Sequence, residues 1–402
     1  MSQMREAGQQ PPPLLRRRNN HVPYDIVLNI LTRLPVKSVI RFRCVCKSWY
    51  SSITCPNFIS THLNNNNKDH NYLIHMPFFA RPMLNSPPTR PFCTLTCDRA
   101  FDTISKFEIP FTLPCGTAIV VGSCNGVLCL VEYENHHTND TYTSVMYLWN
   151  PSIRKFKRLP DYCVSKLHLI RLGFAFHFDD NDYKVVKISP SVPPLEVEVY
   201  TLSSDSWRKV GVPSRPNVAF DNSNLGLPAP YLGGALHWIV NIIDGEEKRN
   251  SEMILSFDVN SEKFGELALP DGALDGGYYW RCVTLFMGKL ALIQFGHSDE
   301  HELLCYIWVM KEYGVPESWI KLFVLPFERF IALFCFTKYG SILIRKGSLV
   351  STNGVLQMGE EKFVLIDPET SCKKNVDIQL PLYVTPFMES LALLDAANVV
   401  TY

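Results

Sequence analysis

The sequence predicts a mainly β protein in which a small domain of three helices precedes a six-bladed β-propeller. Hydrophobic residues follow a helical period up to about residue 63, and beyond residue 70 they follow the two-residue period of strands. The β part also repeats, since Gly234 to Gly288 spans 54 residues and Gly288 to Gly340 spans 52. A period of about 50 residues that contains several short strands is typical of propeller blades.

The helical domain is predicted over residues 21–63. Its first apolar face repeats every three or four residues and comprises Val22, Ile26, Val27, Ile30, Leu31 and Leu34. Pro23 suits a first helical turn, and Pro35 ends the helix because a residue before proline leaves the α region. A second face follows at Val39, Phe42, Cys46, Trp49 and Ile53. Pro56 is expected to close the domain.

Three short helices are too few to bury a generous core, so we expect a partner to complete the domain. Arg33, Lys37, Arg41, Arg43 and Lys47 oppose Asp25 alone, which gives this stretch a net charge of 5 − 1 = +4. The alternative is a helical cap that folds back onto its own chain, and periodicity alone does not decide between the two.

Residues 30–38 (ILTRLPVKS) and 42–49 (FRCVCKSW) resemble the F-box of plant F-box proteins. The family usually opens with Leu-Pro, where this chain has Val22-Pro23, and Tyr24 stands where an acidic residue is common. The resemblance implies an Skp-type adaptor as partner and, through that adaptor, a cullin. The adaptor-binding residues that it implies are Pro23, Ile26, Ile30, Leu34, Pro35, Val39, Val45 and Trp49.

The flanking segments are predicted from composition. Residues 1–20 are rich in Gln, Pro and Arg and are expected to form a disordered leader. Residues 64–70 begin with four asparagines and are expected to form a polar linker that acts as a hinge. The propeller is then predicted over residues 71–396, followed by a tail of residues 397–402.

Five repeat units are visible in the propeller region. In each unit a glycine turn joins two strands, and an Asx or Ser turn joins the outer pair. The units lie at residues 125–156, 182–207, 233–264, 288–319 and 340–370. The spacing and the double glycine Gly233-Gly234 indicate a kelch-like propeller. A β-sandwich is the alternative, but it does not require so regular a period.

Residues 70–395 resemble the F-box-associated domain of plant F-box proteins, most specifically at residues 149–151 (WNP) and 182–185 (DYKV). The stretch 389–394 (ESLALL) is similar to that of the S-locus F-box and S-locus-like group. The resemblance implies the substrate-recognition subunit of an SCF-type ubiquitin ligase, with the target bound by the propeller. Neither the target nor its binding residues can be predicted from the sequence.

The two ends of the propeller region are predicted to share the sixth blade. Residues 72–76, 92–96 and 107–109 look like only three strands, and residues 390–394 look like a lone fourth. A blade has four strands, and an open sheet edge invites aggregation. The C-terminal strand is therefore expected to complete the N-terminal three.

Candidate catalytic and metal sites are weak. Residues 122–126 (GSCNG) fit the outline of a nucleophile elbow, but the motif requires a following helix, and Asn125-Gly126 instead predicts a hairpin. We find no phosphate-binding loop and no paired cysteines at zinc spacing. The sequence therefore predicts a non-catalytic protein with no metal and no cofactor.

The remaining expectations rest on charge and hydropathy. The net charge of zero divides into +3 for residues 1–21, +4 for the helical domain and 0 − 3 − 4 = −7 for the rest. An acidic propeller argues against nucleic-acid binding. No membrane span or signal peptide is predicted, so a cytoplasmic or nuclear location is expected. The rival functions are an adaptor-binding scaffold without ubiquitin transfer and a lectin-like or enzymatic propeller.

Overall fold

The structure is a computed structural model of the 402-residue chain, and it describes seventeen stretches of that chain. These are residues 22–66, 72–77, 92–98, 101–111, 118–135, 142–164, 170–189, 195–211, 218–220, 227–242, 251–272, 278–297, 302–327, 332–352, 355–378, 381–396 and 398–402. The predicted leader, residues 1–20, lies outside these stretches, as does most of the predicted linker. No helix within them combines the length and apolar character needed to cross a membrane.

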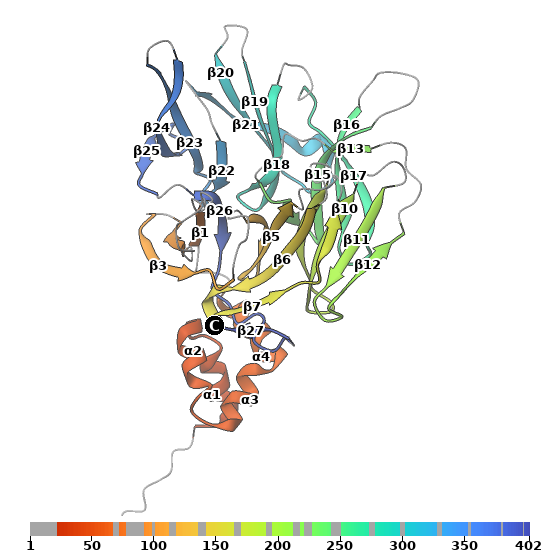
Figure 1. Cartoon of the computed structure of the whole chain (residues 1–402), viewed down its shortest axis with the longest axis vertical. Helices are drawn as coiled ribbons and strands as arrows, with labels where there is room; N and C mark the ends of the chain where they lie inside the picture. The colour runs from red at the N-terminus through yellow and green to blue at the C-terminus, as the bar shows by residue number, and fades with distance from the viewer. Residues whose placement is uncertain are drawn as a thin grey trace, which may run out of the picture.

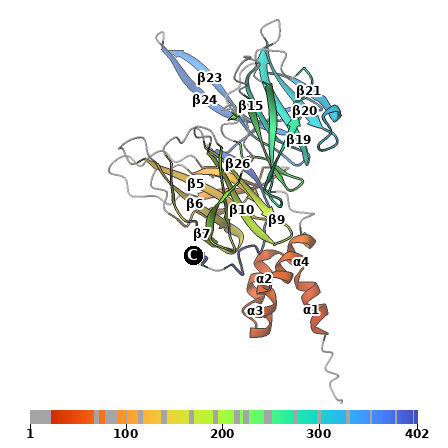
Figure 2. The same ribbon diagram turned by 90° about the vertical axis from the view of Figure 1, so that its right-hand side faces the viewer.

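The N-terminal domain contains four helices rather than the predicted three (Figures 1 and 2). They are α1 (Tyr24–Leu31), α2 (Val36–Phe42), α3 (Lys47–Thr54) and α4 (Pro56–Asn66). The prediction that Pro56 closes the domain was wrong, because this proline occupies the first helical position, where its missing N–H costs nothing.

The predicted hinge at residues 64–67 is also wrong over its described part. Asn64–Asn66 form the last turn of α4, and two of their side chains bond to the end of α1. Asn65 Nδ2 donates to Thr32 Oγ1 (3.0 Å), and Asn66 Nδ2 donates to Thr32 O (2.9 Å). A run of asparagines is therefore held against the helical domain here.

The β region forms six sheets arranged as the blades of a propeller (Figure 1). Blade A consists of β26 (Pro381–Phe387), β1 (Tyr72–Pro77), β2 (Phe92–Cys97) and β3 (Thr103–Glu108). Blade B consists of β4 (Ile119–Cys124), β5 (Val127–Asn135), β6 (Tyr142–Asn150), β7 (Lys155–Arg158), β8 (Tyr162–Val164) and β27 (Val400–Thr401). Blade C consists of β9 (Arg171–His177), β10 (Asp182–Ser189), β11 (Glu196–Thr201) and β12 (Ser206–Val210).

The remaining three blades follow in chain order, as the repeat predicts. Blade D holds β13 (Val218–Phe220), β14 (Tyr231–Leu232), β15 (Ala235–Ile242), β16 (Ser251–Asp258) and β17 (Lys263–Ala268); blade E holds β18 (Tyr278–Phe286), β19 (Lys289–His297), β20 (Leu303–Met310) and β21 (Trp319–Phe327); blade F holds β22 (Ala332–Phe336), β23 (Ile342–Thr352), β24 (Val355–Ile366) and β25 (Lys373–Val376).

The two ends of the propeller share blade A, which confirms a blade built from both termini. The closing strand, however, is β26, whereas residues 390–394 were predicted. β26 pairs antiparallel with β1, with Tyr72 opposite Phe387 and His75 opposite Val384. It is the innermost strand of its blade and lies beside β4 and β22 of the neighbouring blades. Residues 390–394 form no strand, and the predicted tail contributes β27, which pairs with β7.

Lysines with largely buried side chains connect neighbouring blades. Lys157 Nζ of blade B lies 2.8 Å from Asp205 Oδ2 of blade C. Lys184 Nζ of blade C lies 3.0 Å from Glu262 Oε1 of blade D and also donates to Val259 O. Because both lysine side chains are less than a tenth exposed, their charges require these partners.

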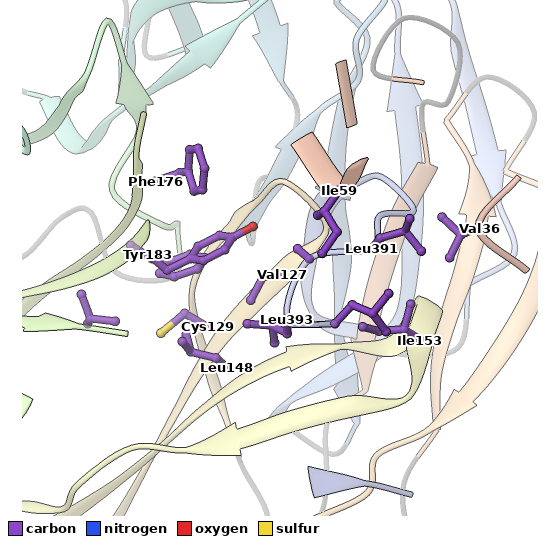
Figure 3. Packing of buried hydrophobic residues seen from close by; sticks show 14 of the residues in the cluster. Val36, Ile59, Val127, Cys129, Leu148, Ile153, Phe176, Tyr183, Leu391 and Leu393 are labelled. Atoms are coloured by element: carbon purple, nitrogen blue, oxygen red, sulfur yellow. The ribbon is translucent and has the colours of Figure 1, made fainter. Parts of the chain in front are cut away.

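The largest hydrophobic cluster spans the helical domain and blades B and C (Figure 3). It includes Val36 and Ile59 of the helices, Val127 of blade B and Tyr183 of blade C. Leu391 and Leu393, near the C-terminus, complete it. The helical domain therefore shares a core with the propeller and lacks the separate core that an independent domain would have.

Shortening the chain tests ring closure. A chain ending at Leu380 lacks β26, whose Val384 and Phe387 are buried. Burying two such side chains contributes roughly 4 kcal/mol, and for a chain of this length we therefore expect melting about 5 °C below that of a chain ending at Phe387. The longer variant keeps β26 and isolates the effect of the strand. Equal melting temperatures by circular dichroism would contradict closure by β26.

Two buried histidines predict how stability depends on pH. Burial lowers the pKa of His75 to about 4 and that of His237 to about 4, although the hydrogen bond to Pro230 O raises the latter. Since the unfolded pKa is ~6.5, the unfolded chain binds more protons between pH 6.5 and 4. Each histidine thus contributes stability that is complete above pH 6.5 and is lost as the pH falls towards 4.

Urea unfolding at pH 7.5 and 5.0 measures this effect. We expect the free energy of unfolding to fall less between these values in His75→Gln and His237→Gln than in the unmodified protein. His297→Gln, at an exposed histidine, is the control. An unchanged pH dependence in both buried variants would refute the assignment.

Candidate partner-binding surface

Exposed apolar side chains gather on α1, on α3 and on the turn between α2 and α3. Val45 is 61% exposed, Ile30 is 52% exposed and Ile26 is 48% exposed. The other members are Val22, Tyr24 and Tyr50. α1 and α3 form the end of the helical domain that points away from the propeller (Figures 1 and 2). Six exposed apolar side chains on so small a domain indicate an interaction surface.

Hydrogen bonds and ring contacts hold this surface in place. The Tyr24 hydroxyl donates to Ser48 O (3.2 Å) and lies 2.8 Å from Ser52 Oγ, which ties α1 to α3. The Arg43 guanidinium lies over the Tyr50 ring, 4.7 Å from its centroid. Phe42 and Trp49 meet edge to face with centroids 5.5 Å apart. The apolar side chains are therefore presented by a fixed helical frame.

The predicted adaptor-binding residues divide into three groups. Those that lie exposed are Pro23, Ile26, Ile30, Pro35 and Val45. Leu34 and Trp49 are partly buried and pack against the shared core. Val39 has no exposed surface and belongs to that core. Its inclusion in the binding set was wrong, because a side chain inside the fold cannot contact a partner.

Sequence reasoning also missed exposed residues. Val22, Tyr24 and Tyr50 lie on the surface but were not among the predicted contacts. Tyr50 directly follows Trp49, so its position on the outer side of α3 was available from helical spacing. A period of 3.6 residues shows which residues share a face, but an outer face and a core face are equally apolar here.

The helical domain also carries exposed basic side chains. Arg33, Lys37, Arg41 and Lys47 are all exposed. Their positive charge favours an acidic partner and speeds encounter with it, an effect that salt screens.

The other candidate sites do not form reactive centres. Residues 122–126 lie in the hairpin between β4 and β5, with Asn125 and Gly126 both at positive φ, as predicted. Burial raises the pKa of Cys124 to about 12, although the hydrogen bond from Phe176 lowers it, so the thiol stays protonated. Within the described stretches, no group of three His, Cys, Asp or Glu side chains is placed to hold a metal ion.

A pocket of about 200 Å³ opens beside blade A, where blades A and F meet. Its lining is His75, Phe92, Thr94, Thr96, Phe101, Thr103, Lys106, Asp377 and Ile378. His75 Nε2 lies 2.7 Å from Thr96 Oγ1, and the low pKa of His75 keeps the ring neutral at pH 7. Threonine hydroxyls and a neutral imidazole can exchange hydrogen bonds with a polar group, and Lys106 and Asp377 add one charge of each sign to the lining.

Two protein families match this chain. The family described as "F-box domain" matches residues 20–61, and the family described as "F-box associated beta propeller domain" matches residues 84–384. The chain belongs to the F-box proteins with an F-box-associated β-propeller. In this family the helical domain described above is the F-box, and family members are typically non-catalytic substrate receptors.

The related proteins are plant F-box proteins. F-box protein At3g07870 of Arabidopsis thaliana is 32% identical over 75% of this chain and 71% of its own length. The F-box/kelch-repeat protein At3g23880 of the same plant is 29% identical over 76% of this chain and 80% of its own length. F-box protein CPR1, also of Arabidopsis thaliana, is 27% identical over 79% of this chain and 76% of its own length. These relationships support a substrate-adaptor role of the SCF type, while the closer resemblance to the S-locus group stays a prediction.

Val39 and Ile30 provide a matched test of burial against exposure. Val39→Ala removes buried methyl groups and should lower the unfolding free energy by about 2 kcal/mol. Ile30→Ala should change stability by less than about 0.5 kcal/mol and should weaken adaptor binding instead. Urea unfolding and calorimetric titration with an Arabidopsis Skp-type adaptor separate the effects. Reversed phenotypes would show that the outer surface is misassigned.

Proposed function

We propose that this protein is the substrate-recognition subunit of an SCF-type ubiquitin ligase. In this proposal the exposed surface of α1 and α3 binds an Skp-type adaptor, the adaptor connects the chain to a cullin, and the propeller holds the target. The observation that supports it most strongly is the apolar surface at the end of the F-box remote from the propeller. It leaves the F-box free for an adaptor while the propeller is free for a target.

The proposed chemistry is positioning. The receptor brings a target lysine close to ubiquitin carried on another enzyme, and proximity raises the rate of transfer. No side chain of the receptor needs to react, which agrees with the buried, protonated Cys124 and with the neutral His75. We place this activity in the cytoplasm, the nucleus or both.

A scaffold that binds the adaptor without supporting ubiquitin transfer is the alternative. The F-box surface would be the same in both cases, so co-purification of the adaptor cannot separate them. Recovery of a cullin, and accumulation of a bound protein when the proteasome is inhibited, would support the receptor. Recovery of the adaptor alone would support the scaffold.

A charged residue in the apolar surface should abolish adaptor binding. Ile30→Glu places a carboxylate in an interface that must lose its water, so we expect at least a ~30-fold loss of affinity. Ile104→Glu is a matched control, because Ile104 is 48% exposed but lies on β3 of the propeller. Pull-down of adaptor and cullin from plant extract measures both variants. Undiminished recovery by a folded Ile30→Glu variant would overturn the proposal.

The exposed basic side chains of the F-box give a kinetic prediction. Raising the salt concentration from 50 to 500 mM should slow adaptor association by about tenfold and should change dissociation much less. Stopped-flow association at several salt concentrations measures this. An association rate that does not respond to salt would rule out electrostatic steering by the F-box.

A further inference from the structure

The C-terminal strap, residues 388–396, lies between the F-box and blade B. It follows β26 directly and forms no strand. Leu391, Leu393 and Leu394 are buried in the same cluster as Val36 of α2 and Ile153 of blade B (Figure 3). The last residues of the propeller therefore form part of the contact through which the F-box is attached.

Partly buried hydrogen bonds fix the strap to blade B. Ser390 Oγ donates to Asn125 O (2.6 Å) in the hairpin between β4 and β5. A Cβ atom at position 126 would lie 2.5 Å from both Met388 O and Ser390 Oγ. Only glycine at this position of the hairpin therefore leaves room for the strap. Lys155 Nζ donates to Leu394 O (3.1 Å) at the other end of the strap.

Asn150 connects the strap to the surface beneath the F-box. It is fully buried at the end of β6, and its Oδ1 accepts from Ser152 N (3.0 Å), which caps the 3-10 helix η1 (Pro151–Ile153). Helix α2 packs against η1. Asn150 Nδ2 donates to Ser390 O (3.1 Å) and to Ala392 O (2.9 Å). One carboxamide therefore holds both η1 and the strap.

The chain end strengthens the same junction. β27 pairs with β7, and Tyr402 N donates to Arg154 O (3.3 Å), next to η1. Trp149 Nε1 donates to the Tyr402 hydroxyl (3.1 Å). By contrast, a direct hydrogen bond between α4 and blade C, from Ser60 Oγ to Asn181 Oδ1, lies at an exposed position. The hydrogen bonds of Asn150 therefore hold the strap on blade B, and the strap in turn contacts the F-box through the buried leucines of the shared cluster.

We propose that Asn150 and the C-terminal strap are positioning elements that fix the angle between the F-box and the propeller, and thereby select which lysines receive ubiquitin. The inference rests on the proposed receptor function. In the transfer step a lysine Nζ attacks the ubiquitin thioester of a conjugating enzyme. An isopeptide bond forms, the C–S bond breaks, and the enzyme thiol leaves with the proton lost from the amine. The rate depends on where the receptor holds each lysine.

Asn150→Asp is the decisive variant. The variant keeps the Oδ1 atom that accepts from Ser152 N. It replaces the NH2 group, which donates to Ser390 O and Ala392 O, with a second carboxylate oxygen that these two carbonyl oxygens repel. The strap should separate while η1 and the ring stay formed. Asn375→Asp makes the same change at an exposed position on β25 of blade F and serves as the control. If Asn150→Asp does not fold, Ser390→Ala removes only the hydroxyl that bonds to Asn125 O.

Two measurements are made on the full chain bound to an Arabidopsis Skp-type adaptor. Dyes at exposed Ser51 of α3 and Glu317 of blade E report the interdomain distance by single-molecule energy transfer. Self-ubiquitination with cullin and conjugating enzyme, mapped by mass spectrometry, reports which of the receptor's own lysines are modified. The unmodified protein should show one narrow distance distribution and a restricted set of modified lysines.

In Asn150→Asp we expect a broad distance distribution and on the order of a 10- to 100-fold slower modification of the favoured lysines. Adaptor affinity should match that of the Asn375→Asp control, whereas the melting temperature should fall below that of the control, because the buried leucines of the strap lose their packing. A narrow distribution and an unchanged lysine map in a folded Asn150→Asp variant would overturn the positioning role. Absence of any ubiquitin transfer by the unmodified protein would instead count against the proposed function, and the distance measurement would still decide the role of the strap.

Discussion

The hydrophobic core shared by the F-box and blades B and C is the interaction on which the rest of the structure depends. The buried apolar side chains of the F-box include Leu31, Val36, Val39 and Ile53, and all belong to a cluster that continues into the propeller. A helical unit of some 45 residues cannot bury enough surface by itself. Attachment to the propeller supplies the missing surface and leaves the outer faces of α1 and α3 available to a partner.

The C-terminus serves both the ring and this junction. β26 closes the propeller by supplying the innermost strand of blade A, and the strap that follows it turns towards the F-box. One continuous segment, residues 381–396, therefore both closes the ring and contacts the F-box. Since β26 pairs with a strand some 300 residues earlier, closure depends on long-range contacts, and we expect the junction to form late in folding.

Much of the fold could be predicted from the sequence because each blade carries its own local signals. Turns such as Asn125-Gly126 need positive φ, which glycine and asparagine allow, and strand faces alternate with period two.

Three features could not be predicted from local signals. Residues 390–394 were predicted as a strand because a short buried apolar segment has the same sequence pattern whether it forms a strand or an irregular loop. Pro56 was predicted to close the helical domain because a proline can end one helix or begin the next. Val39 was assigned to the partner surface because core and outer faces of a helix carry the same apolar period.

Native-state amide exchange on the intact protein tests the shared core most directly. If the F-box and blade B share one core, amides of α2 should exchange only through the same cooperative opening as those of β5 and β6. The Leu394 amide, which bonds to Leu391 O, should open with them. We expect equal opening free energies, within about 1 kcal/mol, for all three segments. Fast exchange throughout α2 and at Leu394 beside a fully protected blade B would show an independent F-box and contradict the account.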